Sequence, residues 1–362
     1  MIREIIKRGL NNNQVILLKE LRLNTYKSLS SALRNLSRKH GIPLSTLKAN
    51  AKVLRDLNLI NVSNGNGVKE VVLTPMGHFV IELLNSTAIK DFTVDLDVIK
   101  VLTERSEIVR RHVLEMVAEA GSGHVGASLS VVDILVTLLT AKMRYDFKNP
   151  KWHLRDRLIL SKGHAAPALY AVLATTGIIP RDELRKFRDI EGILQGHPDT
   201  EIPGVDMVSG SLGQGLSIGC GMALALKNDG IPAKVYVIMG DGELDEGQVW
   251  EAAMTASKLR LDNLIVIIDR NKYQQEGLTE AVKPLEPLVM KWISFGWHVI
   301  EVDGHNFREL LGAFNEADEH KGGPTAIIAH TVKGRGFPPA EGNNKYHSRP
   351  ITKEELRLTG VI

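Results

Sequence analysis

The chain is poor in cysteine, because Cys220 is the only one among its 362 residues. A single thiol cannot form an intramolecular disulfide, and it excludes zinc and iron–sulfur sites that need several cysteines. No apolar stretch approaches the length of a membrane span. Acidic and basic side chains occur within the first eight residues, and they interrupt the apolar core that a signal peptide needs. We therefore expect a reduced, cytoplasmic setting and no membrane segment.

Two common nucleotide-binding patterns are also missing. No G-x-x-x-x-G-K-[ST] occurs, and no G-x-G-x-x-G follows a first strand. What is present is ordinary for a soluble globular protein, with 43% hydrophobic and 24% charged residues. This composition excludes a disordered, collagen-like or low-complexity chain.

Charge divides the chain unevenly, although the formal net charge is only +3. Residues 1–86 hold 13 Lys/Arg and 5 Asp/Glu, a balance of +8. The remainder holds 32 basic and 37 acidic residues, a balance of −5. The sequence therefore predicts a small basic domain over 1–86, a connector over 87–103 and a larger domain over 104–362.

The basic segment has the pattern of a winged helix-turn-helix domain. Helix and hairpin signals alternate along it, and Asn64 to Gly67 suit a tight turn because Asn and Gly tolerate positive φ. The expected elements are a helix over 29–40, a helix capped by Ser45, strands over 59–62 and 68–73, and a last helix from Thr74 to Leu84. Three helices with a hairpin resemble the winged helix-turn-helix class and imply a small α+β domain.

Three basic residues share one face of the second predicted helix. Lys48, Lys52 and Arg55 are spaced four and three residues apart, opposite the leucines of that helix. One interpretation is phosphate contact in a DNA groove. The other is a solvated face on a domain that docks other proteins.

The larger segment alternates apolar strands with helices, including helices over 106–120 and 129–140. The predicted strands are Leu158–Leu160, Lys234–Met239, Asp262–Asp269, Trp297–Val302 and Thr325–His330. Largely apolar strands separated by helices favour an α/β fold with a doubly wound, mostly parallel sheet. Ligands of such sheets bind at the carboxyl ends of the strands.

Polar residues stand at two of those strand ends. One strand runs into Gly240-Asp241-Gly242, and the next ends before Asn271. A carboxylate and an amide oxygen, with a main-chain carbonyl just after Asn271, are ligands for a hard cation such as Mg²⁺, which would take its other oxygens from a diphosphate and water. Gly240 and Gly242 let the main chain approach phosphate oxygens. A Gly-Asp-Gly triplet alone also makes ordinary turns, so the spacing to Asn271 carries the prediction.

Several motifs over about residues 104–362, in order, strongly resemble the thiamine diphosphate-binding half of transketolase. They are Gly123-His124-Val125-Gly126, Asp156 to Ala165 around Ser161-Lys162-Gly163-His164, Gln195-Gly196-His197-Pro198, Gly210-Ser211-Leu212-Gly213-Gln214-Gly215, Gly240-Asp241-Gly242 with Asn271, Lys333-Gly334-Arg335-Gly336, and Tyr346-His347-Ser348-Arg349-Pro350. The resemblance implies the thiamine diphosphate-binding fold.

The same resemblance assigns roles to individual residues. It implies that Mg²⁺ is held by Asp241, Asn271 and the carbonyl of Tyr273. The residues implied in cofactor binding are His164, Gly210, Ser211, Leu212, Gly240, Asp241, Gly242, Asn271 and His347. The catalytic set it implies is His124, His197 and His164. Among these, His164 and His347 would contact the diphosphate, while His124 and His197 would lie near the reacting carbon and move protons.

Other conspicuous residues have plainer interpretations. His112, His153 and His330 match no motif position and are expected to be structural. Cys220 is expected to pack in a small-residue helix, without reactivity. Glu246 and Glu251 are placed by the resemblance towards a subunit interface, or else they complement the dipole at a helix start.

The resemblance covers only part of a transketolase, since neither a pyrimidine-binding domain nor a C-terminal domain has room before Ile362. We expect those domains on a second polypeptide, with the active site between chains, a heterotetramer as the assembly and sugar phosphates as substrates. Alternatives are half of another thiamine-dependent ketol-transfer enzyme, such as one similar to deoxyxylulose-phosphate synthase, or a DNA-binding regulator with a transketolase-like sensor body.

Overall fold

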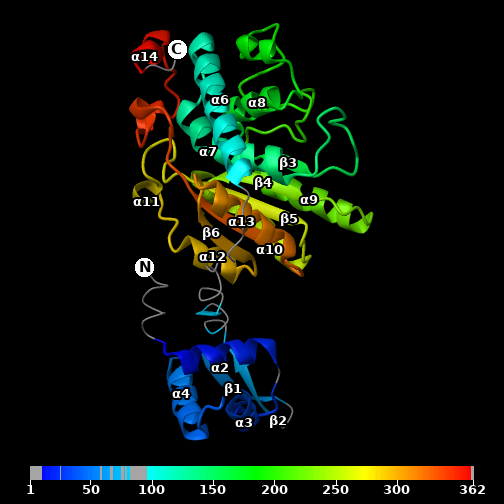
Figure 1. Cartoon of the computed structure of the whole chain (residues 1–362), viewed down its shortest axis with the longest axis vertical. Coiled ribbons are helices and arrows are strands. Elements are labelled where there is room, and N and C mark those ends of the chain that lie inside the picture. Colours follow the sequence, from blue (N-terminus) through cyan, green and yellow to red (C-terminus); the bar gives the residue numbers. More distant parts are fainter. Residues whose placement is uncertain are drawn as a thin grey trace. The chain divides into compact units, whose positions relative to one another are not determined.

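The chain divides into two compact units, residues 1–88 and 89–362, each of which is described by itself (Figure 1). The computed structural model describes residues 10–359 except residues 25, 58, 66–67, 75–76, 78–79 and 82–95. Within these limits the smaller unit contains helices α2 (Asn12–Leu23), α3 (Leu29–His40) and α4 (Leu44–Asp56) and strands β1 (Ile60–Gly65) and β2 (Val68–Leu73).

Helix α2 was not among the predicted elements. It begins at a capping box in which Asn11 and Gln14 bond reciprocally, and it buries Leu17, Leu18 and Leu21. The side chain of Glu20, on the same helix, is also buried. A short polar cap followed by only three core leucines gives a weak periodic signal, and this explains the omission.

Two boundaries in the smaller unit differ from prediction or lie outside the described part. The predicted cap at Ser45 is wrong, because α4 already begins at Leu44 and the carbonyl of Pro43 accepts the N–H of Leu47 at 3.1 Å. Proline has a fixed φ suited to a helix start, which moves the boundary back. Most of the helix predicted from Thr74 to Leu84 lies outside the described residues.

The two strands pair antiparallel, with Ile60 opposite Leu73 and Gly65 opposite Val68. A set of helices followed by a two-stranded sheet is the order expected of a winged helix-turn-helix, and that assignment stays a prediction.

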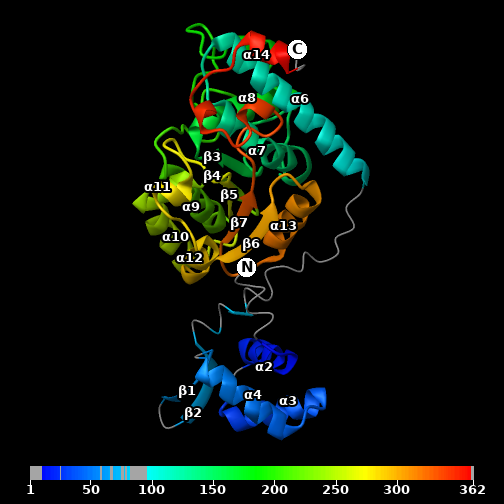
Figure 2. The ribbon, with the colours of Figure 1, turned by 90° about the vertical axis from the view of Figure 1, so that its left-hand side faces the viewer.

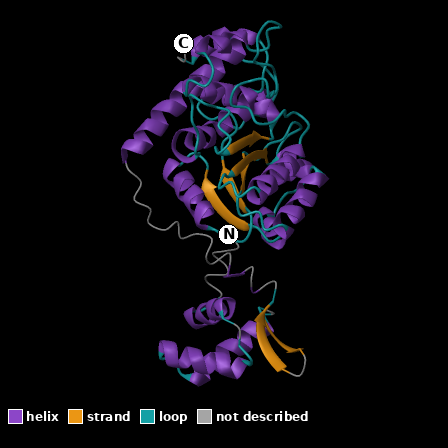
Figure 3. Cartoon of the chain, turned by 90° about the vertical axis from the view of Figure 1, so that its right-hand side faces the viewer, coloured by secondary structure: helices purple, strands orange, loops and turns teal. Residues whose placement is uncertain are grey.

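The larger unit is built on a five-stranded parallel sheet, which confirms the predicted α/β fold. Its strands are β3 (Arg157–Leu160), β4 (Val235–Gly240), β5 (Leu264–Arg270), β6 (His298–Asp303) and β7 (Thr325–His330). They lie in the order β3-β4-β5-β7-β6, each parallel to its neighbours. Figure 3 shows these strands enclosed between helices.

Helices cover both faces of this sheet, as its largely buried, apolar strands require (Figure 2). Along β5, Ile265 and Ile267 pack into the apolar cluster of α6, α7, α8 and α13, while Val266 and Ile268 pack into that of α9, α10 and α12. The helices are α6 (Leu96–Ala120), α7 (Val125–Thr137), α8 (Ala166–Thr175), α9 (Gln214–Asn228), α10 (Gly247–Lys258), α11 (Thr279–Val282), α12 (Leu288–Ser294), α13 (Phe307–Glu319) and α14 (Lys353–Leu358).

Helix α6 begins ten residues before the predicted start at Ser106. Leu102 is fully buried, and Val98 and Ile99 pack against the same cluster. The apolar stripe therefore continues into the segment predicted as a connector, and packing against α7 and α8 extends the helix.

The expectation that no apolar stretch reaches membrane-span length is wrong. In the described part of the chain, one stretch, Val125–Lys142, is long and apolar enough. It consists of α7 and the π-helical turn Leu138–Lys142, and 83% of it is buried inside the larger unit. A helix with apolar residues on every side is what the centre of a large core needs.

Candidate cofactor-binding site

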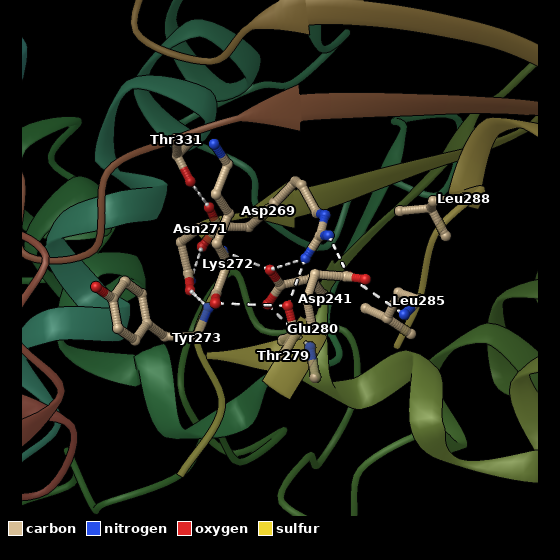
Figure 4. A network of polar contacts seen from close by, with 12 residues as sticks. Asp241, Asp269, Asn271, Lys272, Tyr273, Thr279, Glu280, Leu285, Leu288 and Thr331 are labelled. Atoms are coloured by element: carbon tan, nitrogen blue, oxygen red, sulfur yellow. Dashed lines mark hydrogen bonds and ion pairs between the residues drawn. The ribbon is translucent and has the colours of Figure 1, made fainter. Parts of the chain in front are cut away.

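The sheet register brings the predicted metal ligands together at the carboxyl ends of β4 and β5. Gly240 lies directly opposite Asp269, so Asp241 and Asn271 follow on adjacent strands (Figure 4). Both side chains are buried, Asp241 with 1% exposure. Lys272 then adopts a φ of 70°, a left-handed conformation that turns the chain sharply after Asn271.

The carboxylate of Asp241 is held through both oxygens. Oδ1 accepts the N–H of Gly242 at 2.9 Å. Oδ2 accepts the N–H of Lys272 at 2.6 Å and Nη1 of Arg270 at 3.0 Å. Burial nevertheless raises the pKa of Asp241 to about 6, although Arg270 acts against it. A divalent cation beside this carboxylate would favour its charged form, so the residue fits a metal ligand.

Asn271 is oriented by its neighbours on the same edge. Its Oδ1 accepts the N–H of Tyr273 at 3.1 Å, and its Nδ2 lies 3.4 Å from Ser130 Oγ and from Asp269 Oδ2. No group of three or more His, Cys, Asp or Glu side chains that could hold a metal occurs among the described residues. The available oxygens of Asp241, Asn271 and the Tyr273 carbonyl suit a hard cation that takes further ligands from a bound diphosphate.

Arg270 ties this edge to the segment that follows it. Its guanidinium is 3% exposed and donates to Thr279 Oγ1 at 2.7 Å, Glu280 Oε1 at 2.7 Å and Glu286 Oε1 at 3.1 Å, besides Asp241. Figure 4 shows Asp241, Thr279 and Glu280 close together in this network. One side chain thus joins the Asp241 carboxylate to α11.

The four predicted histidines converge from separate loops on one cavity of about 420 Å³. The ring centroids of His124, His164 and His347 lie 5.3 to 5.7 Å from one another. His197 lines the same cavity, together with Gly240, Asp241, Gly242, Asn271 and Tyr273. The structure therefore places all four side chains at the predicted metal edge, which residue spacing alone could not do.

Burial favours the neutral form of these imidazoles. Burial lowers the pKa of His124 to about 4, with Arg188 adding to the effect. Burial, then Lys333, lowers the pKa of His347 to about 3, and the pKa values of His164 and His197 are lowered mainly by burial as well. Each neutral ring offers one donor and one acceptor. Nδ1 of His124 is buried and has no hydrogen-bond partner in the described part of the chain.

Glycines shape the walls of the cavity. A Cβ on Gly242 would lie 2.6 Å from Cβ of Gln274, while one on Gly240 would meet nothing closer than 3.9 Å. Gly210 has a φ of 154° and lies against the His197 ring, which would be 3.3 Å from an added Cβ. Gly242 is therefore needed for close packing, whereas the gap at Gly240 is open towards the cavity.

The loop over 210–215 is only partly as predicted. Gly210 and Leu212 line the cavity, but Ser211 is exposed and lies outside its lining. The carboxylate of Glu243 fixes the loop instead, accepting the N–H of Gly213 at 2.8 Å and that of Gly240 at 3.0 Å.

Two buried lysines of the cavity belong to the sequence motifs, although no role was predicted for them. Lys162 donates to the carbonyl of Ala127 at 3.1 Å and to Asp269, whose side chain is fully buried. Lys333 is also buried, and burial, then Lys162, lowers its pKa to about 8. The available sequence signal was their position beside predicted site glycines and histidines.

The remaining candidates behave as follows. Cys220 is buried as expected, with Sγ 3.7 Å from the carbonyl of Ala252. His112 and His330 lie beside Glu115 and Glu301 and outside the cavity lining. His153 is also outside the lining, as is the exposed Glu251, whereas the exposed Glu246 lines the cavity mouth.

The fold and site together define a class: an α/β domain that binds an organic diphosphate through a divalent cation at neighbouring strand ends. Comparison with known families gives the specific member. The family described as "Transketolase, thiamine diphosphate binding domain" matches residues 102–360. The chain belongs to the transketolase family, and thiamine diphosphate is the cofactor of this domain.

Two curated relatives match the larger unit over nearly their whole length. The 6-deoxy-6-sulfo-D-fructose transketolase subunit SqwG of a Clostridium species is 46% identical over 254 residues, covering 70% of this chain and 92% of the relative. A subunit of the apulose-4-phosphate transketolase of Phocaeicola vulgatus is 41% identical over 257 residues, covering 71% of this chain and 92% of the relative.

Solved transketolases share the fold over a smaller part of their length. The Campylobacter jejuni enzyme superposes with a TM-score of 0.68 at 34% identity, covering 72% of this chain and 43% of that enzyme. The Leishmania mexicana enzyme gives 0.67 at 32% identity, with 70% and 40% covered. This chain therefore spans about two fifths of each of these enzymes.

Proposed function

We propose that this chain, a thiamine diphosphate-binding transketolase subunit, transfers two-carbon ketol units between sugar phosphates together with a second chain. The observation that carries the proposal is the convergence of four neutral imidazoles on the edge formed by Asp241 and Asn271. Relatives named as subunits match over 92% of their own length, which supports a separate polypeptide for the remaining domains.

Each side chain at the site has a role in this reaction. Thiamine diphosphate supplies the carbanion sink of ketol transfer when it is bound. Asp241, Asn271 and the Tyr273 carbonyl hold Mg²⁺ against its diphosphate. His164 and His347, each with one N–H when neutral, donate to diphosphate oxygens.

The other two histidines act near the reacting carbon. His124 has a buried Nδ1 without a partner in the described chain, and the exposed His197 also lines the cavity. Neutral imidazoles accept and return protons at substrate oxygens, as breaking and forming a C–C bond beside a hydroxyl requires.

The substrates are proposed as sugars with an anionic group. The names of both relatives describe such sugars, one with a sulfonate and one with a phosphate. The pathway proposed is the pentose phosphate interconversion in the cytoplasm, which a single buried thiol at Cys220 suits.

The second chain is proposed to carry a pyrimidine-binding and a C-terminal domain, in a heterotetramer of two pairs. The test is to purify this chain alone, the second chain alone and the two together, and to assay ketol transfer to an aldose phosphate. We expect activity only in the mixture and a mass of two pairs by light scattering. Robust ketol transfer by this chain alone would refute the division, and a requirement for pyruvate as donor would favour the deoxyxylulose-phosphate type of reaction.

Substitutions test the site itself. Asp241→Asn removes the carboxylate charge from the cation site, and we expect the mixture to lose at least about 100-fold in activity, partly restored by excess Mg²⁺. His330→Ala is the matched control, because its ring pairs with Glu301 at 3.0 Å and lies outside the cavity lining. Equal activity of the two variants would refute the assignment of the site.

We also propose that the smaller unit binds DNA. Lys48, Lys52 and Arg55 are exposed on α4 opposite the buried Leu47 and Leu54. No ion pair involves the three basic residues within the described part of the chain. A row of free cations on one helix face suits successive phosphates.

Fluorescence anisotropy with a labelled duplex tests this second function. Changing the three residues to alanine should lower affinity and reduce the slope of log affinity against log salt by about 3. Lys19→Ala, an exposed lysine on α2, is the control. Salt-independent binding, or an unchanged slope in the triple variant, would refute it and favour the protein-docking interpretation.

A further inference from the structure

Helix α4 of the smaller unit carries rows of side chains with different properties. Because an α-helix has 3.6 residues per turn, residues four apart lie in one row along its surface. The row of Leu47 and Ala51 is buried in the core of the smaller unit. The row of Lys48 and Lys52 is exposed and basic. One face of the helix therefore belongs to the core, and the next face is positively charged.

The third row is apolar, although it faces solvent. Ala49 and Val53 follow the two lysines in the chain, so they form the neighbouring row around the helix. Leu57 continues this row just past the end of α4. Val53 is 42% exposed and Leu57 is 52% exposed, and Ala49 is exposed as well. Single apolar side chains are common on protein surfaces, but this row forms an uncovered apolar strip beside a basic one.

The charges beside the apolar row favour an anionic partner. Lys48, Lys52 and Arg55 are exposed and form no ion pair within the described part of the chain. The acidic residue of α4, Asp56, is its last residue, so no acidic side chain interrupts the two rows before the helix ends. Double-stranded DNA presents regularly spaced anions, and its major groove admits an α-helix. The basic row and the neighbouring apolar row fit this partner together.

The apolar row can read only one kind of feature in that groove. Ala49 and Val53 end in methyl groups, so they neither donate nor accept hydrogen bonds at base edges. Against a polar base edge they would remove water without replacing its hydrogen bonds, which is unfavourable. The apolar group that base pairs expose in the major groove is the C5 methyl of thymine. Contact with this methyl group buries apolar surface on both sides and is favourable.

We propose that α4 enters the major groove of DNA and that Ala49 and Val53 select base pairs that carry a C5 methyl group there. This inference rests on the DNA binding proposed for the smaller unit and adds a base preference to it. Burying one methyl group against an apolar side chain corresponds to about fourfold in affinity. Contact with one or two such groups therefore corresponds to a preference of about 4- to 15-fold.

Fluorescence anisotropy of the full chain can compare duplexes that differ only in this methyl group. One is a labelled A·T-rich duplex of about 21 base pairs, or two helical turns, and the other has deoxyuridine in place of every thymine. At the same salt concentration, we expect the deoxyuridine duplex to bind about 4- to 15-fold more weakly. A G·C duplex should bind more tightly, by a similar factor, when its cytosines carry a 5-methyl group. This second pair separates the methyl group from the shape of A·T-rich DNA.

A substitution in the apolar row tests whether the row is the source of the preference. Val53→Ser removes both methyl groups of the side chain and should lower the preference about fourfold, with the slope of log affinity against log salt unchanged. Val53 faces solvent, so the change leaves the buried row of α4 intact. Leu23→Ser, at a 77% exposed apolar residue of α2, is the matched control and should keep the full preference.

Three results would overturn the proposal. Equal, salt-dependent binding of the thymine and deoxyuridine duplexes would exclude the base preference and leave the DNA binding of the smaller unit intact. An undiminished preference in Val53→Ser would exclude the apolar row as its source. Absence of binding to any of the duplexes would refute the proposed DNA binding and this inference together, and would favour a protein partner for the apolar row.

Discussion

Replacing Lys162 with Met should strongly destabilise the larger unit. The ammonium is 1% exposed and pairs with Asp269, which is fully buried. Methionine preserves the length of the stem but removes the charge, so a buried carboxylate loses its counter-ion. Breaking a buried ion pair by removing one partner typically costs about 3–5 kcal/mol.

The structure places the expected cost within that range. After the change, Asp269 still accepts Ser130 Oγ at 2.6 Å and the hydroxyl of Thr331, which keeps part of its solvation. The carbonyl of Ala127, 3.1 Å from the ammonium, loses this donor but still accepts Ser130 Oγ at 3.1 Å, so its loss adds little. We therefore expect a loss of about 4 kcal/mol, and we expect Lys162→Met/Asp269→Asn to recover at least half of it.

Urea unfolding followed by tryptophan fluorescence measures this loss in the cofactor-free chain at pH 7. All four tryptophans lie between residues 152 and 297, so the signal reports on the larger unit alone. The control is Lys227→Met, because Lys227 pairs with Asp262 at 2.8 Å near the surface, where such pairs contribute about 0–1 kcal/mol. A loss below about 1 kcal/mol for Lys162→Met, or no recovery in the double variant, would refute the reasoning.

Three further outcomes follow from local contacts. Gly242→Ala should weaken binding of thiamine diphosphate and Mg²⁺ in calorimetry, because the new Cβ would lie 2.6 Å from that of Gln274 and displace the loop; unchanged affinity would contradict this. A hydrogen bond from Tyr26, ahead of other contributions, lowers the pKa of Glu20, so this carboxylate stabilises the smaller unit above its unfolded pKa. That stability should be lost as pH falls through the lowered value, and Glu20→Gln should flatten the pH dependence of amide exchange in α2; parallel curves would exclude the role. Burial raises the pKa of Cys220 to about 11, so a thiol reagent at pH 8 should label the chain only after unfolding, and rapid native labelling would disprove burial.

The sequence predicted the sheet and its binding edge well because both depend on local pattern. The run Leu264–Arg270 is buried at every position, and such a run has few interpretations other than a central parallel strand. Asp241 and Asn271 follow two strands of this kind directly. Parallel strands end at one edge, so two local patterns were enough to bring the predicted ligands together.

Boundaries set by packing were harder to predict. Helix α6 continues ten residues towards the N-terminus because Leu102 packs into a core made with α7 and α8. The apolar stretch Val125–Lys142 is a second case in which the local sequence was not enough. Whether such a stretch faces lipid or protein is decided by partners from distant parts of the chain, which periodicity does not contain.

The two buried lysines of the cavity could not be predicted from the sequence pattern, because that pattern does not contain the partners of a buried charge. Lys162 and Lys333 each stand beside a glycine in a loop motif, a context in which lysine is ordinarily exposed. Their burial depends on Asp269, 107 residues from Lys162, and on Asn344 and His347 beyond a turn. A buried charge is tolerated only where its partner is placed to within a hydrogen bond, and that placement exists only once the sheet has formed. The histidines could be predicted because they belong to motifs, whereas the buried lysines that help to lower the pKa values of His164 and His347 could be identified only from the assembled fold.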